Sequence, residues 1–170
     1  MSKLIYWVNP ICYNISMYLT IHAAMGGAIG QFINEPWLAF FIGFASHLLL
    51  DAIPHGDEDI IKWKLFKSDT AKMAVAASID FAGLIIMTIY WVAGTPLAQM
   101  TGLLYGMAGA MAPDALWGFH QLTKTPLLRW YRDGHTKFHY LFTHRHLTIL
   151  QGFAVQIPLL AVMTWVIAKF

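Results

Sequence analysis

Long apolar segments separated by short turns constrain the fold of this chain more than any other feature. A helix needs about 20 apolar residues to cross the hydrocarbon core of a bilayer. Only 12% of the residues are charged and the mean hydropathy is +0.53, whereas about 25% of residues are charged in soluble domains. We therefore predict an integral membrane protein of all-α fold, a polytopic bundle of about five transmembrane helices in a single domain. The predicted spans are residues 16–33, 36–53, 72–93, 96–112 and 147–168, and the domain covers residues 1–170.

The turns between these spans contain residues that commonly begin or end helices. Proline is favoured at the first position of a helix, and Pro36 stands where the second span begins. Gly94 and Pro96 precede the fourth span. We expect Pro113 and Asp114 to end that fourth helix, because a proline removes a backbone hydrogen bond.

Two polar connections predict the orientation of the chain. Residues 54–71 indicate a surface loop, and residues 115–146 indicate an amphipathic helix that lies along the membrane interface. We do not expect a cleaved signal sequence, because Met1 to Pro10 contain no long apolar core and no small-residue cleavage site. Ten of the 11 lysines and arginines fall on the side of these segments, and Lys169 is alone on the other side. Because cytoplasmic loops are enriched in Lys and Arg, we predict a cytoplasmic (inner) membrane protein with its N-terminus inside and its C-terminus outside.

Histidines and aspartates of separate spans fall at one predicted depth. His47 and Asp51 stand four residues apart, so they share one face of a helix. Every member of the set lies within roughly 12 Å of the cytoplasmic interface at 1.5 Å per residue. Ionisable residues inside spans are expensive and tend to face one another or a wet cavity. We therefore predict a polar cavity that opens to the cytoplasm. The set is His22, His47, Asp51, Asp80, Asp114 and His144.

Imidazole and carboxylate ligands without thiolate suit Zn²⁺, Mn²⁺ or Fe²⁺. Cys12 is the only cysteine, which excludes a site built from several thiolates. We expect one or two divalent ions, with zinc favoured. The predicted metal ligands are His22, His47, Asp51, Asp114 and His144, with Asp80 as a further ligand or as a residue that orients one. A structural interpretation stays open, in which these side chains only satisfy one another.

We predict different roles for the other polar residues. His55 and Asp57 are candidates for a second metal or for general acid–base catalysis. Arg145 is placed either to bind a phosphate or to anchor at lipid headgroups. His120 and His135 are expected to be ordinary surface or interfacial residues.

Four short stretches resemble a known family, the YdjM-like inner-membrane metal-dependent hydrolases. The matching residues are His22 and Gly26; Ser46, His47 and Asp51; Pro113 and Asp114; and His144, Arg145 and Thr148. In the last stretch His146 stands where the family has glycine, and Ile149 stands where it has histidine. The resemblance implies a small multi-span protein with metal-dependent hydrolase activity.

These observations favour a membrane-embedded, metal-dependent hydrolase that acts on a lipid phosphoester at the cytoplasmic face. Its partners would be membrane lipids and an anionic, lipid-like substrate, and the formal charge of +2 is too small to indicate nucleic acid. One alternative is a di-iron membrane oxidoreductase, because His135 and His139, with His144 and His146, faintly resemble the histidine boxes of desaturases and hydroxylases. The other is a transporter or scaffold with a structural polar cluster. Transport would need an oligomer, because five spans leave little room for a path in one chain.

Overall fold

A computed structural model of the chain describes residues 17–53, 67–123, 125–139 and 147–170. These residues are helical throughout and contain no strand, which confirms the predicted all-α fold. The helices are α1 (Leu19–Gly30), α2 (Pro36–Asp51), α3 (Asp69–Gly94), α4 (Leu97–Thr123), the 3₁₀ helix η2 (Pro126–Leu128), α5 (Arg129–His139) and α6 (Ile149–Lys169).

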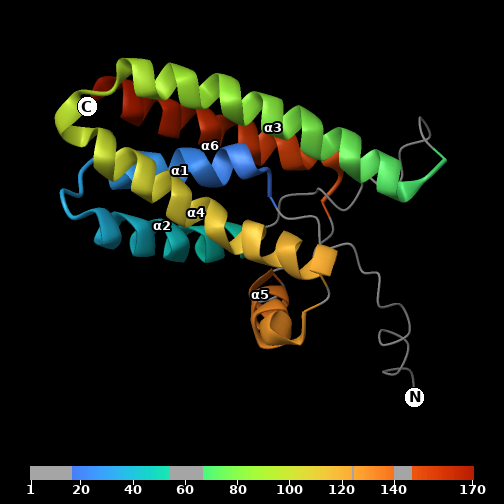
Figure 1. The fold of residues 1–170 in the computed structure, drawn as a ribbon. Coiled ribbons are helices and arrows are strands. Elements are labelled where there is room, and N and C mark those ends of the chain that lie inside the picture. The colour runs from blue at the N-terminus through green and yellow to red at the C-terminus, as the bar shows by residue number, and fades with distance from the viewer. Residues whose placement is uncertain (1–16, 54–66, 124, 140–146) are drawn as a thin grey trace.

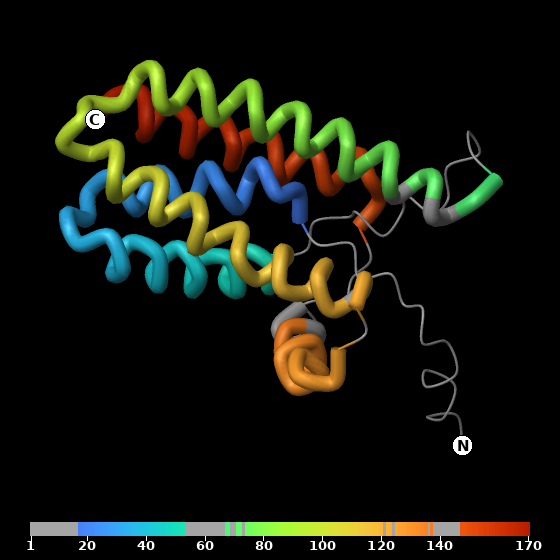
Figure 2. Tube along the Cα trace, viewed as in Figure 1, coloured from blue at the N-terminus to red at the C-terminus, as the bar shows by residue number. Residues whose placement is uncertain are grey.

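The long helices run side by side and α5 crosses them. In Figure 1, α1, α2, α3, α4 and α6 have roughly aligned axes, whereas α5 is seen nearly end-on beside the last turns of α4. The α1–α2 turn, the α3–α4 turn and the C-terminus lie together at one end of the bundle (Figure 2). The last residues of α2, the last turns of α4 and the whole of α5 lie at the other end. Asp51, the last residue of α2, belongs to this second end.

Glycines bring α1, α2 and α4 into close contact. A Cβ atom on Gly26 would collide with the backbone carbonyl of Gly106, and a Cβ atom on Gly30 would collide with that of Gly102. Gly43 of α2 approaches Gly106 in the same way. The spacing of Gly26 and Gly30 predicts such a close helix contact, and the structure confirms it.

The number of membrane-length helices is smaller than expected. Among the described residues, two helical segments are long and apolar enough to cross a membrane, Ala74–Gly94 and Ile149–Lys169. α1 has 12 residues and α2 has 16, which at 1.5 Å per residue makes them roughly 18 and 24 Å long, short of the roughly 30 Å of a hydrocarbon core. The described residues therefore contain fewer candidate spans than the five predicted: α1 and α2 are short, and α4, with 27 residues, is long but is not among the helices apolar enough to cross a membrane.

The end of the fourth helix was predicted at the wrong place. Pro113 lies inside α4, which continues to Thr123. A proline removes only one hydrogen bond of the ladder and its local cost of about 3 kcal/mol can be offset by packing. Pro113 is almost completely buried. Part of the predicted interfacial segment 115–146 is therefore an extension of α4, and α5 is its amphipathic helix.

Candidate metal centre

The last two turns of α2 carry the first two residues of the centre. His47 and Asp51 stand one turn apart, and the side chains of both are fully buried. His47 Nε2 lies 2.8 Å from Asp51 Oδ2. The spacing of four residues explains this contact, because side chains at i and i+4 lie on the same face of a helix.

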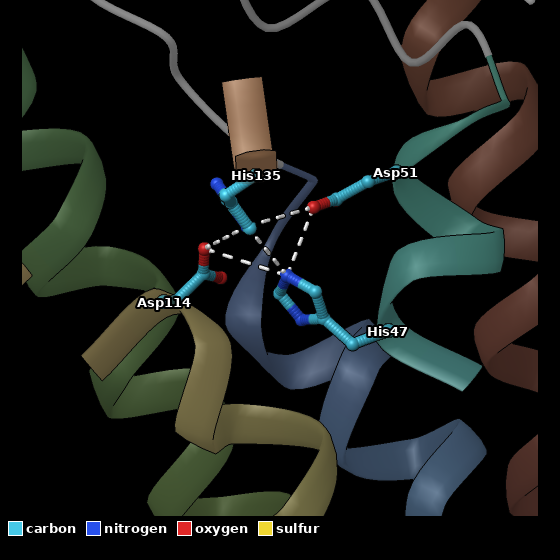
Figure 3. Close-up of side chains that lie close together, drawn as sticks. All are labelled: His47, Asp51, Asp114 and His135. Carbon is cyan, nitrogen blue, oxygen red and sulfur yellow. Dashed lines mark hydrogen bonds and ion pairs between the residues drawn. The ribbon is translucent and has the colours of Figure 1, made fainter. Parts of the chain in front are cut away.

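Asp114 of α4 and His135 of α5 complete a group of four side chains that point toward one another (Figure 3). His135 Nε2 lies 3.1 Å from His47 Nε2 and 3.3 Å from Asp51 Oδ2. Asp114 Oδ1 lies 3.7 Å from His47 Nε2 and 4.0 Å from His135 Nε2. One potential ligand atom from each residue lies within 4.8 Å of the others, so the group could hold a metal ion.

The separations are close to those between the ligands of a small divalent cation, and slightly shorter. Ligand bonds of about 2.0–2.1 Å in a tetrahedral zinc site place neighbouring ligand atoms roughly 3.3–3.4 Å apart. The distances that join His47 Nε2, His135 Nε2 and Asp51 Oδ2 are between 2.8 and 3.3 Å. Asp114 is farther from both nitrogens, and its side chain is 15% exposed. Three close ligand atoms with a fourth group on the open side resemble a catalytic arrangement more than a closed structural site.

The hydrogen bond of the His47 ring fixes its tautomer. His47 Nδ1 lies 2.8 Å from the carbonyl oxygen of Ala110, and because a carbonyl can only accept, Nδ1 must carry the proton. In the neutral ring the lone pair is then on Nε2, which faces Asp51 Oδ2 and His135 Nε2. Metal-binding histidines commonly donate their other N–H to a carbonyl in this way. A cation at this position would replace the proton that can otherwise bridge His47 Nε2 and Asp51 Oδ2.

His22 of α1 contacts the other oxygen of Asp51. Its Nε2 lies 3.1 Å from Asp51 Oδ1, and both side chains are fully buried. Its ring stacks on that of His47, with centroids 3.9 Å apart and planes inclined by 28°. His22 lies outside the group of four ligand atoms, so in this arrangement it orients the Asp51 carboxylate. The structure therefore brings together four of the six predicted metal ligands, namely His22, His47, Asp51 and Asp114.

Asp80 lies apart from this cluster, although it was predicted to be a further ligand or to orient one. Its carboxylate accepts hydrogen bonds from the backbone N–H groups of Leu19, at 2.6 Å, and Thr20, at 3.2 Å. It also accepts a bond of 2.6 Å from the Thr20 hydroxyl. The first N–H groups of a helix lack partners within the helix and carry partial positive charge. Asp80 of α3 therefore caps the N-terminus of α1 from a neighbouring helix.

The expectation for His120 and His135 is wrong, because both side chains are buried. Each is 4% exposed. His120 Nδ1 lies 3.0 Å from the carbonyl oxygen of Thr125. This contact holds the turn after α4 against the helix. His135 joins the four-residue group described above. The sequence feature that could have identified His135 is its position one turn after Tyr131, on the same face of an amphipathic helix.

Tyr131 adds a polar group beside His135. The two rings stack with centroids 5.8 Å apart and planes inclined by 27°. The phenol oxygen is buried and has no hydrogen-bond partner in the part of the chain that the structure describes. Burial raises the pKa of Tyr131, and the nearby charges of Asp114 and Asp51 raise it further. The hydroxyl therefore keeps its proton near neutral pH.

Four residues of the predicted site, His55, Asp57, His144 and Arg145, lie outside the described residues.

Comparison with known proteins gives no match to a family model, to a curated protein or to a solved structure.

Proposed function

We propose that the protein is a membrane-embedded, metal-dependent hydrolase that cleaves a phosphoester of a lipid at the cytoplasmic face. The observation that carries this proposal is the convergence of His47, Asp51, Asp114 and His135 within 4.8 Å. The donor set fits zinc, with manganese and iron as the other ions that such ligands bind. The resemblance to YdjM-like hydrolases points the same way.

The residues divide naturally into ligands and a base. A bound divalent ion supplies a Lewis acid and lowers the pKa of a coordinated water to about 7. His47, His135 and Asp51 would hold such an ion, and His22 and the Ala110 carbonyl keep two of these residues in place. Asp114, which is partly exposed and farther from the nitrogens, would act as the general base for a water molecule.

The outer surface of the bundle supports a membrane setting. Ile79 and Ile86 of α3, and Ile157 and Trp165 of α6, each expose more than half of their surface. α3 and α6 contain the two segments that could cross a membrane. Large exposed apolar surfaces of this kind are typical of contact with lipid. The metal centre lies at the end of the bundle near α5 (Figure 1), whose exposed Arg129 and Lys137 suit anionic headgroups.

A cavity between α1, α3 and α6 supports an amphiphilic substrate. Its volume is about 320 Å³, and its lining is almost entirely apolar. The polar groups in the lining are already engaged, since Asp80 accepts from Thr20 and Gln156 Oε1 accepts from the backbone N–H of Tyr18. Ile21 lines this cavity, and His22, the next residue, contacts Asp51. Successive residues of α1 therefore contact a cavity suited to a hydrocarbon chain and a residue of the metal centre.

The test is an assay of the purified full chain in detergent with phospholipids and isoprenoid phosphates. We expect phosphate or headgroup release that a chelator abolishes and added Zn²⁺ or Mn²⁺ restores. Asp114→Asn should lower kcat at least about a hundredfold, the usual loss when a general base is removed. Asp133→Asn is the matched control, because Asp133 is exposed and pairs only with Arg132 among the described contacts. Absence of metal-dependent turnover on every substrate would contradict the proposal.

One feature of the centre favours the oxidoreductase alternative. Two histidines and one carboxylate with an open side are also the ligand set of non-haem iron enzymes. His47, His135 and Asp51 form such a set. A coloured, oxygen-sensitive iron protein would favour that alternative, whereas a colourless zinc protein would favour the hydrolase.

A further inference from the structure

We propose that the Tyr131 hydroxyl is the hydrogen-bond donor that binds an oxygen of the anionic group taken by the metal centre. This inference rests on the proposed function only in requiring an oxyanion beside the metal. The ligand class is a tetrahedral oxyanion, such as a phosphate ester or inorganic phosphate. Tyr131 would then contact the substrate directly, on the side of α5.

The position of Tyr131 follows from the helix that carries His135. The two residues are one turn apart on α5, and their rings stack with centroids 5.8 Å apart. Stacking fixes the phenol ring relative to a residue of the metal group. The phenol ring is therefore held against a residue of the centre.

The hydroxyl oxygen is buried and lacks a hydrogen-bond partner among the described residues. Burial of a hydroxyl group without a hydrogen bond is unfavourable. Buried polar groups in folded proteins nearly always have a partner, so an exception beside a metal group indicates a place for a ligand atom.

The other ring N–H groups are less suited to this role. The Nδ1–H group of His47 donates to the Ala110 carbonyl. His22 Nδ1 is also buried without a hydrogen-bond partner among the described residues, but His22 contacts Asp51 Oδ1 through Nε2 and lies outside the group of four ligand atoms. The carboxylates of Asp51 and Asp114 would repel an anion. An oxyanion would therefore be bound by the cation through its charge and by Tyr131 through a directed hydrogen bond, which an uncharged tyrosine can give at neutral pH.

The experiment compares Tyr131→Phe with the wild-type full chain, each loaded with Zn²⁺ or Mn²⁺ in detergent. Inorganic phosphate is titrated by calorimetry, and the affinity for the metal alone is measured in parallel. Loss of a hydrogen bond to a charged ligand corresponds to a rise of at least about tenfold in the Kd for phosphate. We expect that rise with no more than about a twofold change in metal affinity, because phenylalanine keeps the stacked ring. Tyr90→Phe is the control, since Tyr90 is 56% exposed on α3.

The outcomes separate this inference from the proposed function. Equal phosphate affinity in wild type and Tyr131→Phe would overturn the role of Tyr131, as would a wild-type protein that binds metal but no phosphate. A wild-type protein that binds no metal would overturn both proposals. Phosphate binding that depends on Tyr131, in a protein with no turnover on any phosphoester, would support this inference and remove the hydrolase. Melting temperatures of all three proteins verify that they are folded equally well.

Discussion

At the residue scale, two aspartates that the sequence predicts at the same depth point their side chains in different directions. Asp51 faces His22 and His47, whereas Asp80 faces the first turn of α1. The sequence predicts the depth of each residue, because depth follows from position along a helix. It does not predict how each helix is rotated about its axis. Asp80 was therefore grouped with metal ligands although its oxygens serve backbone N–H groups.

Replacement of Asp80 tests this distinction. Asp80→Asn removes one acceptor oxygen and sets an NH₂ group among the N–H donors of Leu19 and Thr20. We expect a loss of about 1–2 kcal/mol in the free energy of unfolding, as for the removal of a helix cap. The number of metal ions bound per chain should not change. A stable Asp80→Asn protein that has lost its metal would show that Asp80 is a ligand after all.

His135 shows what sequence patterns cannot supply. His22, His47, Asp51 and Asp114 could be grouped because each sits near one end of an apolar segment. His135 lies on a short helix that crosses the bundle (Figure 1), and its approach depends on the turns after Thr123. No periodicity in the sequence determines the direction of such a crossing helix.

At the element scale, close backbone contacts of α4 with α1 and α2 set the spacing of three helices that carry site residues. Gly26 and Gly30 approach Gly106 and Gly102 so closely that no side chain fits between the backbones. This contact could be predicted from the glycine spacing, because small residues four apart form one face of a membrane helix. The continuation of α4 through Pro113 could not be predicted from the sequence, because the cost of the proline is offset by packing against other helices.

Two alanine substitutions in α4 separate this contact from helix propensity. Gly106→Ala should destabilise the protein by about 1–3 kcal/mol, because its Cβ would collide with the backbone of α1. Gly118→Ala should be neutral or stabilising by up to about 1 kcal/mol, because nothing lies within 4 Å of its Cβ position. Thermal unfolding in detergent measures both. Equal effects of the two substitutions would contradict the close approach.

At the scale of the whole molecule, the ends of the bundle differ in chemistry. The end that carries α5 holds the metal group, and the opposite end holds the C-terminus (Figure 2). The excess of basic residues on the first side predicts that it is cytoplasmic. The described residues contain two candidate spans instead of the five predicted.

Cysteine labelling tests this orientation in intact cells. Lys137 of α5 and Lys169 of α6 are both exposed, and Cys12 is the sole native cysteine. In a Cys12→Ser background, Lys169→Cys should react with a membrane-impermeant thiol reagent added outside. Lys137→Cys should react only after the membrane is permeabilised. The reverse pattern, or labelling of both from outside, would show that the chain is oriented differently.

The most direct measurement of the central claim is the metal content of two histidine variants and the wild type. His135 and His120 are equally buried, but only His135 belongs to the metal group. After exposure to Zn²⁺ and removal of weakly bound ions, elemental analysis should find about one ion per chain in the wild type and in His120→Ala. His135→Ala should lose most of that metal. A folded wild-type protein without bound metal, or a His135→Ala protein with undiminished metal, would contradict the account.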